Sequence, residues 1–190
     1  FAITAKPITV TATAGQTKIY GDSDPIFAYT SSPALIGSDS FTGSLSRAEG
    51  ETVGTYAINQ SSLALSANYN LTFASNDFTI IKATPVITWA NPSDIVYGTA
   101  LSATQLNASS SVAGTFIYTP AGGTVLNAGS QTLSAIFTPD DAVNYNSVTQ
   151  TATINVTAKP ITVTADAKTK SYGTPDPALT YQMTSGALVG

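Results

Sequence analysis

An eight-residue segment, AKPITVTA, occurs at residues 5–12 and returns without change at residues 158–165. An identical segment so much later in one chain indicates that a whole structural unit is repeated. A protein needs a catalytic centre only once, whereas repeated units supply length, spacing or multivalency. The repeat therefore favours a chain of small modules placed one after another.

The repeated segment itself predicts a β-strand. Residues 7–13 alternate Ile8 and Val10 with threonine, which is the period-two pattern of a half-buried strand, and the face with Ile8 and Val10 is the expected core face. Residues 26–29 are a second expected strand. Residues 54–58, after a charged turn, are expected to form one arm of a hairpin. We expect an all-β chain without a true helix.

Corresponding motifs divide the chain into modules. The segment Ala83-Thr84-Pro85 precedes a strand as residues 5–7 do, and Tyr97-Gly98 and Tyr145 follow at the spacing that separates Tyr20-Gly21 from Tyr69. The expected segments are the end of a preceding module at 1–4, a first module at 5–82, a second at 83–157, and an incomplete opening half of a third at 158–190.

The segments that join the modules predict how the modules are arranged. The modules are joined through short segments that end in proline, and proline restricts both itself and the residue before it to extended conformations. We expect stiff joints, a rod of modules placed end to end, and a natural protein that is a longer array of which these residues are a slice.

Composition excludes several functional classes. The chain has no Cys and no His, which removes thiol nucleophiles, imidazole acid/base chemistry and the usual zinc sites, so we expect no enzyme. Its net charge of −4, without a run of Lys or Arg, does not suit a nucleic-acid partner. No segment reaches the 18 apolar residues expected of a membrane span.

A Tyr-Gly-x-x-Asp-Pro motif with a following tyrosine marks the first module and the third segment. Its residues are Tyr20, Gly21, Asp24, Pro25 and Tyr29, and again Tyr172, Gly173, Asp176, Pro177 and Tyr181. These residues resemble the MBG domain family of bacterial surface proteins. The second module, with Tyr97-Gly98, is similar to the bacterial Ig-like β-sandwich repeats of large adhesins.

The two resemblances imply a function without catalytic residues. They suggest a stalk or filament segment of a secreted or cell-surface adhesin, whose partners are neighbouring repeats of the same chain and, through other parts of the protein, a host or environmental surface. Lateral association of modules into a fibre is a further expectation. The alternative is a glycan-binding module, in which Trp89 and Tyr97 stack on a sugar ring.

Other candidate sites have a structural interpretation beside the functional one. The tyrosines of the Tyr-Gly pairs and of the two Asn-Tyr corners either form a row of binding sites or pack on the core and bind turns. Arg47 with Glu49 and Glu51 is either an acid pair with a basic helper or a solvated turn with an exposed ion pair. Calcium has four candidate ligands, although their spacing does not match a calcium loop: Asp22, Asp24, Asp140 and Asp141.

Two modifications also remain open from the sequence. Lys18 recurs as Lys170 and, with Lys6 and Lys82, is a candidate for an internal Lys-Asn cross-link of the kind some surface adhesins contain. Glycosylation has four candidate acceptors in Asn-x-Ser/Thr segments, namely Asn59, Asn70, Asn107 and Asn155.

Overall fold

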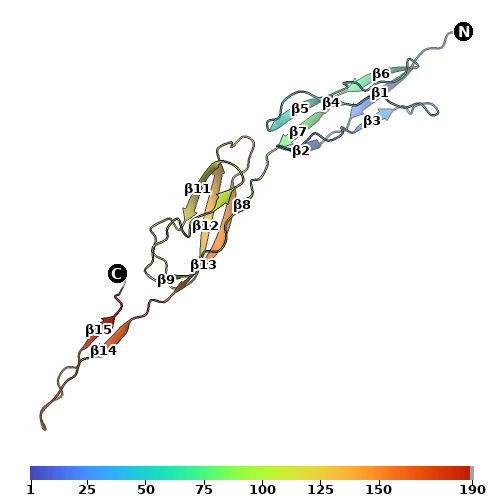
Figure 1. Cartoon of the computed structure of the whole chain (residues 1–190). Coiled ribbons are helices and arrows are strands. Elements are labelled where there is room, and N and C mark those ends of the chain that lie inside the picture. Colours follow the sequence, from blue (N-terminus) through green and yellow to red (C-terminus); the bar gives the residue numbers. More distant parts are fainter. Residues whose placement is uncertain (189–190) are drawn as a thin grey trace. The chain divides into compact units, whose positions relative to one another are not determined.

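The computed structural model describes residues 1–188, and its regular secondary structure there consists of β-strands alone (Figure 1). The expected all-β class is confirmed. The strands are β1 (Lys6–Ala12), β2 (Gln16–Ile19), β3 (Tyr29–Ser32), β4 (Ser46–Arg47), β5 (Gly54–Asn59), β6 (Tyr69–Ala74), β7 (Asp77–Ile81), β8 (Ile87–Thr88), β9 (Ile95–Val96), β10 (Ser109–Ser110), β11 (Gly114–Thr119), β12 (Gly129–Pro139), β13 (Val148–Thr157), β14 (Thr162–Ala165) and β15 (Tyr181–Ser185).

The chain forms two compact units. Unit 1 contains Phe1–Pro85, Val112–Gly114 and Thr138–Ser147, and unit 2 contains Val86–Ser111, Thr115–Phe137 and Val148–Gly190. Two short segments from the middle of the sequence therefore belong to unit 1. The module boundaries expected from the sequence remain predictions, because this division groups residues by proximity and not by repeat.

Two sheets make up unit 1. One has the strand order β3-β1-β6, and the other has the order β2-β7-β5-β4 (Figure 1). Strand β1 is antiparallel to β3 and parallel to β6, and β2 is parallel to β7. The first two strands of the unit thus pair with its last two strands, which come more than 60 residues later.

The core of unit 1 follows the alternation of the sequence. Ile8, Val10 and Ala12 of β1 are each at most 1% exposed, and Phe78 and Ile80 of β7 are fully buried. Burial of a large apolar side chain stabilises a fold by about 1.5–3 kcal/mol relative to leaving it in water. The period-two pattern therefore places β1 correctly, and the burial of these apolar side chains is the main stabilising term of the unit.

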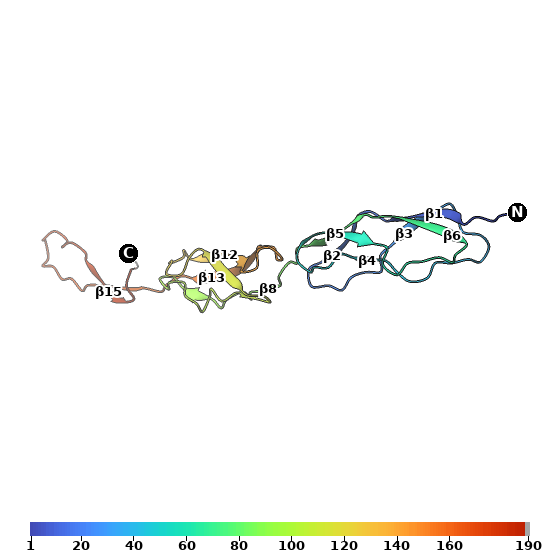
Figure 2. The ribbon, with the colours of Figure 1, turned by 90° about the horizontal axis from the view of Figure 1, so that it is seen from above.

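Unit 2 has its own sheet and core. Strands β11, β12, β13 and β9 form a four-stranded sheet in that order, and β14 with β15 forms a separate two-stranded hairpin. The two long strands of the larger sheet, β12 and β13, lie side by side (Figure 2). The core side chains alternate along the two long strands of the larger sheet, and Leu133, Phe137 and Ile154 are fully buried. The ring of Phe116 lies 4.9 Å from that of Phe137.

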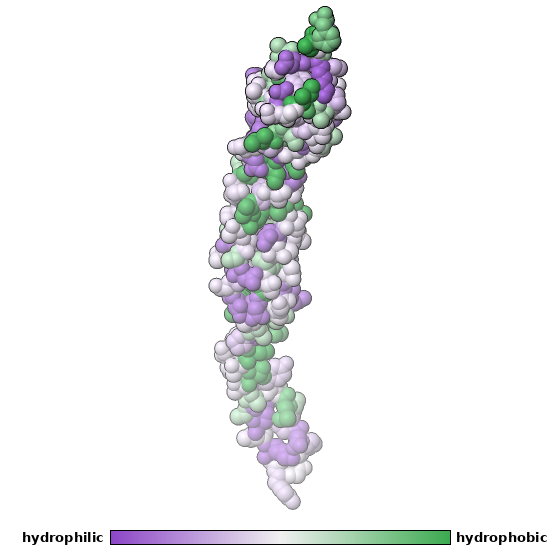
Figure 3. All heavy atoms as spheres, turned by 90° about the vertical axis from the view of Figure 1, so that its right-hand side faces the viewer, coloured by the Kyte–Doolittle hydropathy of each residue, from purple (hydrophilic) through white to green (hydrophobic). Residues whose placement is uncertain are grey.

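Weakly polar residues cover much of the molecule. Only 9% of the residues are charged, and in Figure 3 residues of intermediate hydropathy separate the small purple and green areas on the visible face. Threonine occupies the outward positions of β1 and β13. Charged side chains are few, so a cluster of them beside the core is an unusual feature of this chain.

One expected strand lies elsewhere. A strand was expected at residues 26–29, but residues 26–28 are not in a strand and β3 begins only at Tyr29. The side chain of Gln16 binds the backbone N–H and carbonyl of Ala28 just before it. The Gln16 amide thus occupies the Ala28 N–H, while the Ala28 carbonyl also accepts from the backbone N–H of Thr13. Phe27 turns into the core and is 8% exposed. Strand β2 was not predicted, since its sequence, QTKI, contains two polar residues and a lysine.

Candidate functional site

The Tyr-Gly-x-x-Asp-Pro segment forms a turn directly after β2. The backbone N–H of Tyr20 donates to Ile81, and the N–H of Asp22 donates back to Ile19. Gly21 has a φ of 90°, in the left-handed region that favours glycine. This turn reverses the chain and directs the Asp24 carboxylate back towards β2.

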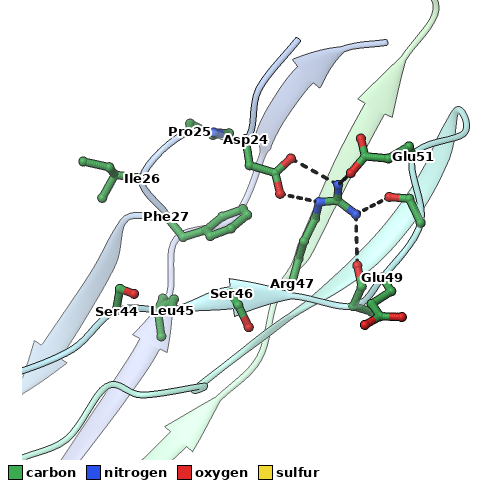
Figure 4. Close-up of a pocket in the computed structure, with 12 residues that line it drawn as sticks. Asp24, Pro25, Ile26, Phe27, Ser44, Leu45, Ser46, Arg47, Glu49 and Glu51 are labelled. Carbon is green, nitrogen blue, oxygen red and sulfur yellow. Dashed lines mark hydrogen bonds and ion pairs between the residues drawn. The ribbon is translucent and has the colours of Figure 1, made fainter. Parts of the chain in front are cut away.

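Two cations and two carboxylates meet beside this turn, and we call Lys18, Asp24, Arg47 and Glu51 the charge cluster. The Lys18 ammonium lies 2.7 Å from Asp24 and also contacts Glu51. The Arg47 guanidinium binds both Asp24 oxygens, at 2.8 and 3.1 Å, and its Nη2 also pairs with Glu51 (Figure 4). The cations are buried, with side chains 4% and 5% exposed, whereas those of Asp24 and Glu51 are 34% and 68% exposed.

Arg47 is the centre of the charge cluster. Besides both carboxylates, its guanidinium donates to the backbone carbonyls of Ala48 and Gly50. The ring centroids of Tyr56 and Phe78 lie 4.9 and 5.7 Å from its central carbon, within the range of cation–π contact. The N–H donors of the guanidinium therefore all have acceptors within unit 1, and the group also contacts two aromatic rings.

The electrostatics keep the charge cluster ionised. Hydrogen bonds to Asp24 and Glu51 raise the pKa of Lys18 above its ordinary value. Burial on its own would raise the pKa of Asp24, but hydrogen bonds from Lys18 and Arg47 outweigh it and lower that pKa, and the hydrogen bond from Lys18 lowers the pKa of Glu51. None of these groups moves towards neutrality, so the cluster is suited to holding strands together and not to proton transfer.

A groove of about 610 Å³ runs beside the charge cluster. Figure 4 shows Phe27 and the Asp24–Arg47 pair along it, and the side chain of Ile26 is 95% exposed. The polar groups that line it at Arg47 and Asp24 already bind each other. Among the residues the structure describes, no three His, Cys, Asp or Glu side chains are placed to hold a metal ion.

The residues of the charge cluster lie within a segment that matches a known protein family. A family model described as MBG domain (YGX type) matches residues 8–79 and 161–190, together more than half of the chain. The chain belongs to the MBG domain (YGX type) family. No curated protein matches the sequence. Residues 80–160 lie outside the match, and their likeness to Ig-like repeats remains a prediction.

The MBG match covers the whole charge cluster in the first segment and half of it in the second. Lys170 pairs with Asp176 in residues 161–190, as Lys18 pairs with Asp24. That second pair is open to water, with side chains 49% and 81% exposed. Gly173 again has a positive φ, of 82°, and Pro177 follows Asp176. The tyrosines Tyr172 and Tyr181 are 107% and 70% exposed.

The other tyrosines of the MBG segment act as structural anchors. The Tyr69 hydroxyl donates to the Asp39 carboxylate and accepts from the Ile36 N–H, and these contacts lie at a corner before β6. The Tyr29 ring meets Phe41 edge to face, with centroids 5.4 Å apart. The side chains bind turns and neighbouring rings.

The candidate residues between 83 and 157 are dispersed. Within unit 1, the Tyr145 ring contacts Tyr20 at 5.4 Å, and Asp141 accepts from the Asn144 side chain. In unit 2, Tyr97 packs against the core and Gly98 has a φ of 96°. The remaining calcium candidates, Asp22 and Asp140, are exposed turn residues.

Trp89, the candidate for stacking on a sugar, is 7% exposed. Its indole N–H donates to the Gln105 carbonyl, and its ring contacts Tyr118 edge to face at 5.4 Å. Trp89 follows directly after β8 and packs into the core of unit 2, so its ring is not free to stack on a sugar.

The charge cluster corrects one interpretation of the sequence. One of the two interpretations placed Arg47 in a solvated turn with an exposed ion pair, but its side chain is buried and its bidentate partner is Asp24. The reason is the cation–π contact of the guanidinium with the rings of Tyr56 and Phe78, which favours its buried position. The available signal was the joint recurrence of Lys18 and Asp24 as Lys170 and Asp176.

Substitution of Gly50 by alanine should strongly destabilise unit 1. Gly50 has a φ of 133°, and an added Cβ would lie 2.4 Å from the Tyr56 ring that supports Arg47. The ring and the guanidinium would both have to move. Thermal unfolding followed by circular dichroism tests this, with Gly15→Ala as the control, since Gly15 also has a positive φ but nothing within 4 Å of an added Cβ. Equal losses in both variants would contradict the steric argument.

Acid should destabilise unit 1 through the charge cluster. Because the folded-state pKa values of Asp24 and Glu51 lie below their ordinary values of 3.8 and 4.5, the unfolded chain binds more protons as the pH falls. Their contribution is complete above these ordinary values and is lost as the pH falls through the lower folded-state values. Urea unfolding between pH 7 and pH 2 measures it, and the double variant Asp24→Asn, Glu51→Gln should have a flatter pH profile.

Proposed function

We propose that this chain is a structural repeat segment of a bacterial extracellular surface protein, an adhesin stalk or filament, and not an enzyme. The observation that carries the proposal is the MBG signature in two segments, each with a lysine–aspartate pair at the same place. A second copy of such a turn adds further structure to the chain and supplies no reactive group.

The chemistry of the charge cluster supports this role. Its four side chains come from β2, the turn after it, β4 and the loop before β5, so they join segments that would otherwise be held by short strands alone. Strand β4 has two residues and β2 has four. Ion pairs whose cations are buried, placed between short strands, resist local opening, and a module under mechanical load requires such resistance.

Location at the cell surface is part of the same proposal. The family resemblance is to surface proteins, and the polar surface is built from threonine, serine and asparagine with few charges, as is common outside the cell. In the part of the chain that the structure describes, no helix is long and apolar enough to span a membrane.

Single-molecule force spectroscopy tests the mechanical role. The 190-residue chain, held at its two ends, should unfold in discrete force peaks and refold when the force is released. The Arg47→Met variant should lower the peak that belongs to unit 1. Extension without force peaks would contradict the proposal. Saturable binding of one glycan on a glycan array, retained by the Arg47→Met variant, would favour the glycan-binding alternative.

A further inference from the structure

A loop from the second expected module is part of unit 1. Residues 140–147 connect β12 to β13, which pair with each other in the larger sheet of unit 2, yet these residues belong to unit 1. We call residues 140–146 the docked loop. The sequence assigns the loop to the module expected at 83–157, whereas its partners in unit 1 include residues of the module expected at 5–82. The loop is therefore a place where one expected module contacts the one before it.

Asn144 is the buried centre of the docked loop and is 6% exposed. Its side-chain oxygen accepts a hydrogen bond from the Val53 N–H at 2.8 Å. Its side-chain amide donates to the Asp141 carboxylate, also at 2.8 Å, and its backbone N–H donates to the same carboxylate at 3.1 Å. Burial of a side-chain amide is costly unless its polar groups are paired. Both ends of the Asn144 amide are paired while the loop lies against Val53.

Two further contacts hold the docked loop on the first expected module. The Tyr145 ring meets the Tyr20 ring edge to face, with centroids 5.4 Å apart, a geometry that aromatic pairs favour. The Lys82 ammonium donates to the Ala142 carbonyl at 2.6 Å. Tyr20 and Val53 in turn pack against the core of unit 1. We call Tyr20, Val53 and Lys82 the docking surface.

The turn that carries Tyr20 is built in the same way in both expected modules. The Tyr20 N–H donates to the Ile81 carbonyl at 2.9 Å, and the Tyr97 N–H donates to the Thr157 carbonyl at 2.8 Å. In each case the next residue is a glycine with a positive φ, and the residue after that glycine donates back across the turn. The tyrosine of the docking surface is thus a repeated feature whose position is fixed by backbone hydrogen bonds.

The Asn-Tyr corner of the docked loop is repeated as well. The Asn144 carbonyl accepts from the Ala83 N–H at 3.0 Å, and the Asn68 carbonyl accepts from the Lys6 N–H at 2.8 Å. The tyrosine after each asparagine pairs in parallel with that same alanine or lysine. The modules expected at 5–82 and 83–157 therefore each have one Tyr-Gly turn and one Asn-Tyr corner.

The turn and the corner lie at opposite ends of the first expected module. Strand β1 runs parallel to β6, and β2 runs parallel to β7, so Lys6 and Tyr69 are at the end where the module begins, and Ile19 and Ile81 are at the end where it finishes (Figure 1). Two different surfaces at opposite ends suit a head-to-tail contact, the kind that joins copies into an open chain.

We propose that the Tyr-Gly turn of one module is the docking surface for the Asn-Tyr corner of the module that follows it, and that Asn144 determines this recognition here. The partner is a loop of defined chemistry, in which an asparagine binds an aspartate three residues before it and a tyrosine follows directly. The linker at residues 82–85 would keep the modules in one chain without these contacts, whereas docking makes their contact specific. This inference goes beyond the mechanical role proposed above and does not depend on it.

Hydrogen exchange of the 190-residue chain, followed by NMR, tests the docking. The readout is the Val53 amide, whose acceptor lies 91 residues later, on Asn144. Tyr145→Leu keeps that acceptor and removes the ring contact with Tyr20. Because the loop docks as one unit, exchange at Val53 should become roughly tenfold faster, the factor expected from the loss of one hydrogen bond. Tyr20→Leu should produce the same change from the opposite side of the contact.

Two controls separate undocking from other effects. Asn107→Ala removes an exposed asparagine of unit 2 whose side chain donates to the Thr104 carbonyl, and it should leave exchange at Val53 unchanged. Amides in the middle of β1 and β7 should keep their protection in every variant, because the core of unit 1 stays folded when the loop leaves. Exchange at Val53 that neither tyrosine variant changes would overturn the proposal. So would equal acceleration at Val53 and throughout β1 and β7, because the loop would then be an inseparable part of unit 1.

A reciprocal pair of substitutions tests the role of Asn144 itself. Asn144→Asp keeps an acceptor for the Val53 N–H but places a second carboxylate against Asp141, and two such charges repel. We expect fast exchange at Val53 in this variant at neutral pH. The double variant Asp141→Asn, Asn144→Asp restores one donor and one acceptor and should recover most of the protection. Wild-type protection in Asn144→Asp alone, or no recovery in the double variant, would contradict the assignment to Asn144.

Discussion

Replacing Phe78 with alanine is expected to lower the free energy of unfolding of unit 1 by roughly 3–5 kcal/mol, the range for large aromatic residues in cores. The side chain is fully buried, and its ring contacts Phe27 edge to face with centroids 5.1 Å apart. It also lies under the Arg47 guanidinium. The substitution removes apolar burial, an aromatic pair and part of the support of the charge cluster together.

The measurement is chemical unfolding of the whole chain with separate probes for the two units. The hydrophobic cores of the two units consist of different residues, so Phe78→Ala should shift one transition and leave the other in place. Leu133→Ala, at a fully buried position in unit 2, is the matched control and should shift the second transition instead. Equal shifts of both transitions in either variant would mean that the units do not unfold independently.

Replacing Arg47 with methionine is expected to destabilise unit 1 by roughly 3 kcal/mol, the lower end of the range for breaking a buried ion pair. Methionine keeps the apolar stem in contact with Tyr56 and Phe78 but removes every guanidinium donor. Asp24 retains Lys18 and is a third exposed, which limits the loss. The Gly50 and Ala48 carbonyls lose their donor as well.

Two further variants identify the cause of this effect. Arg47→Lys keeps the charge but cannot bind Asp24 through two parallel hydrogen bonds, so it should fall between the wild type and Arg47→Met. Glu49→Gln changes a charge in the same turn outside the charge cluster and should have little effect. If Arg47→Lys were as stable as the wild type, the charge alone would account for the cluster. A large loss in Glu49→Gln would contradict its assignment to Arg47.

The strands and the family signature were predictable because their signals are local. Alternation over residues 7–13 identifies the buried face of β1, and the Tyr-Gly-x-x-Asp-Pro motif identifies the turn after β2. Strand β2 was not predictable in this way, because its inward residue is Lys18, whose burial depends on Asp24 and Glu51. A pattern of apolar residues cannot reveal a strand whose interior position is charged.

The charge cluster was only partly predictable for a related reason. Arg47 and Glu51 lie close in sequence, and their pairing follows from spacing alone, whereas the bidentate contact joins Arg47 on β4 to Asp24 in the segment after β2. Their approach depends on the sheet β2-β7-β5-β4, in which β2 and β4 are the outer strands. The same holds for Thr138–Ser147, which belongs to unit 1 through contacts such as that of Tyr145 with Tyr20.

The parallel pairing in unit 1 has a consequence for the order of folding. Lys6 pairs with Tyr69 and Gln16 with Phe78, so the first two strands obtain these partners only after nearly the whole module has been synthesised. Closing such long loops costs entropy before any contact is gained, and it slows folding. Neither sheet of unit 1 can therefore be completed until the last two strands of the module, β6 and β7, have been synthesised.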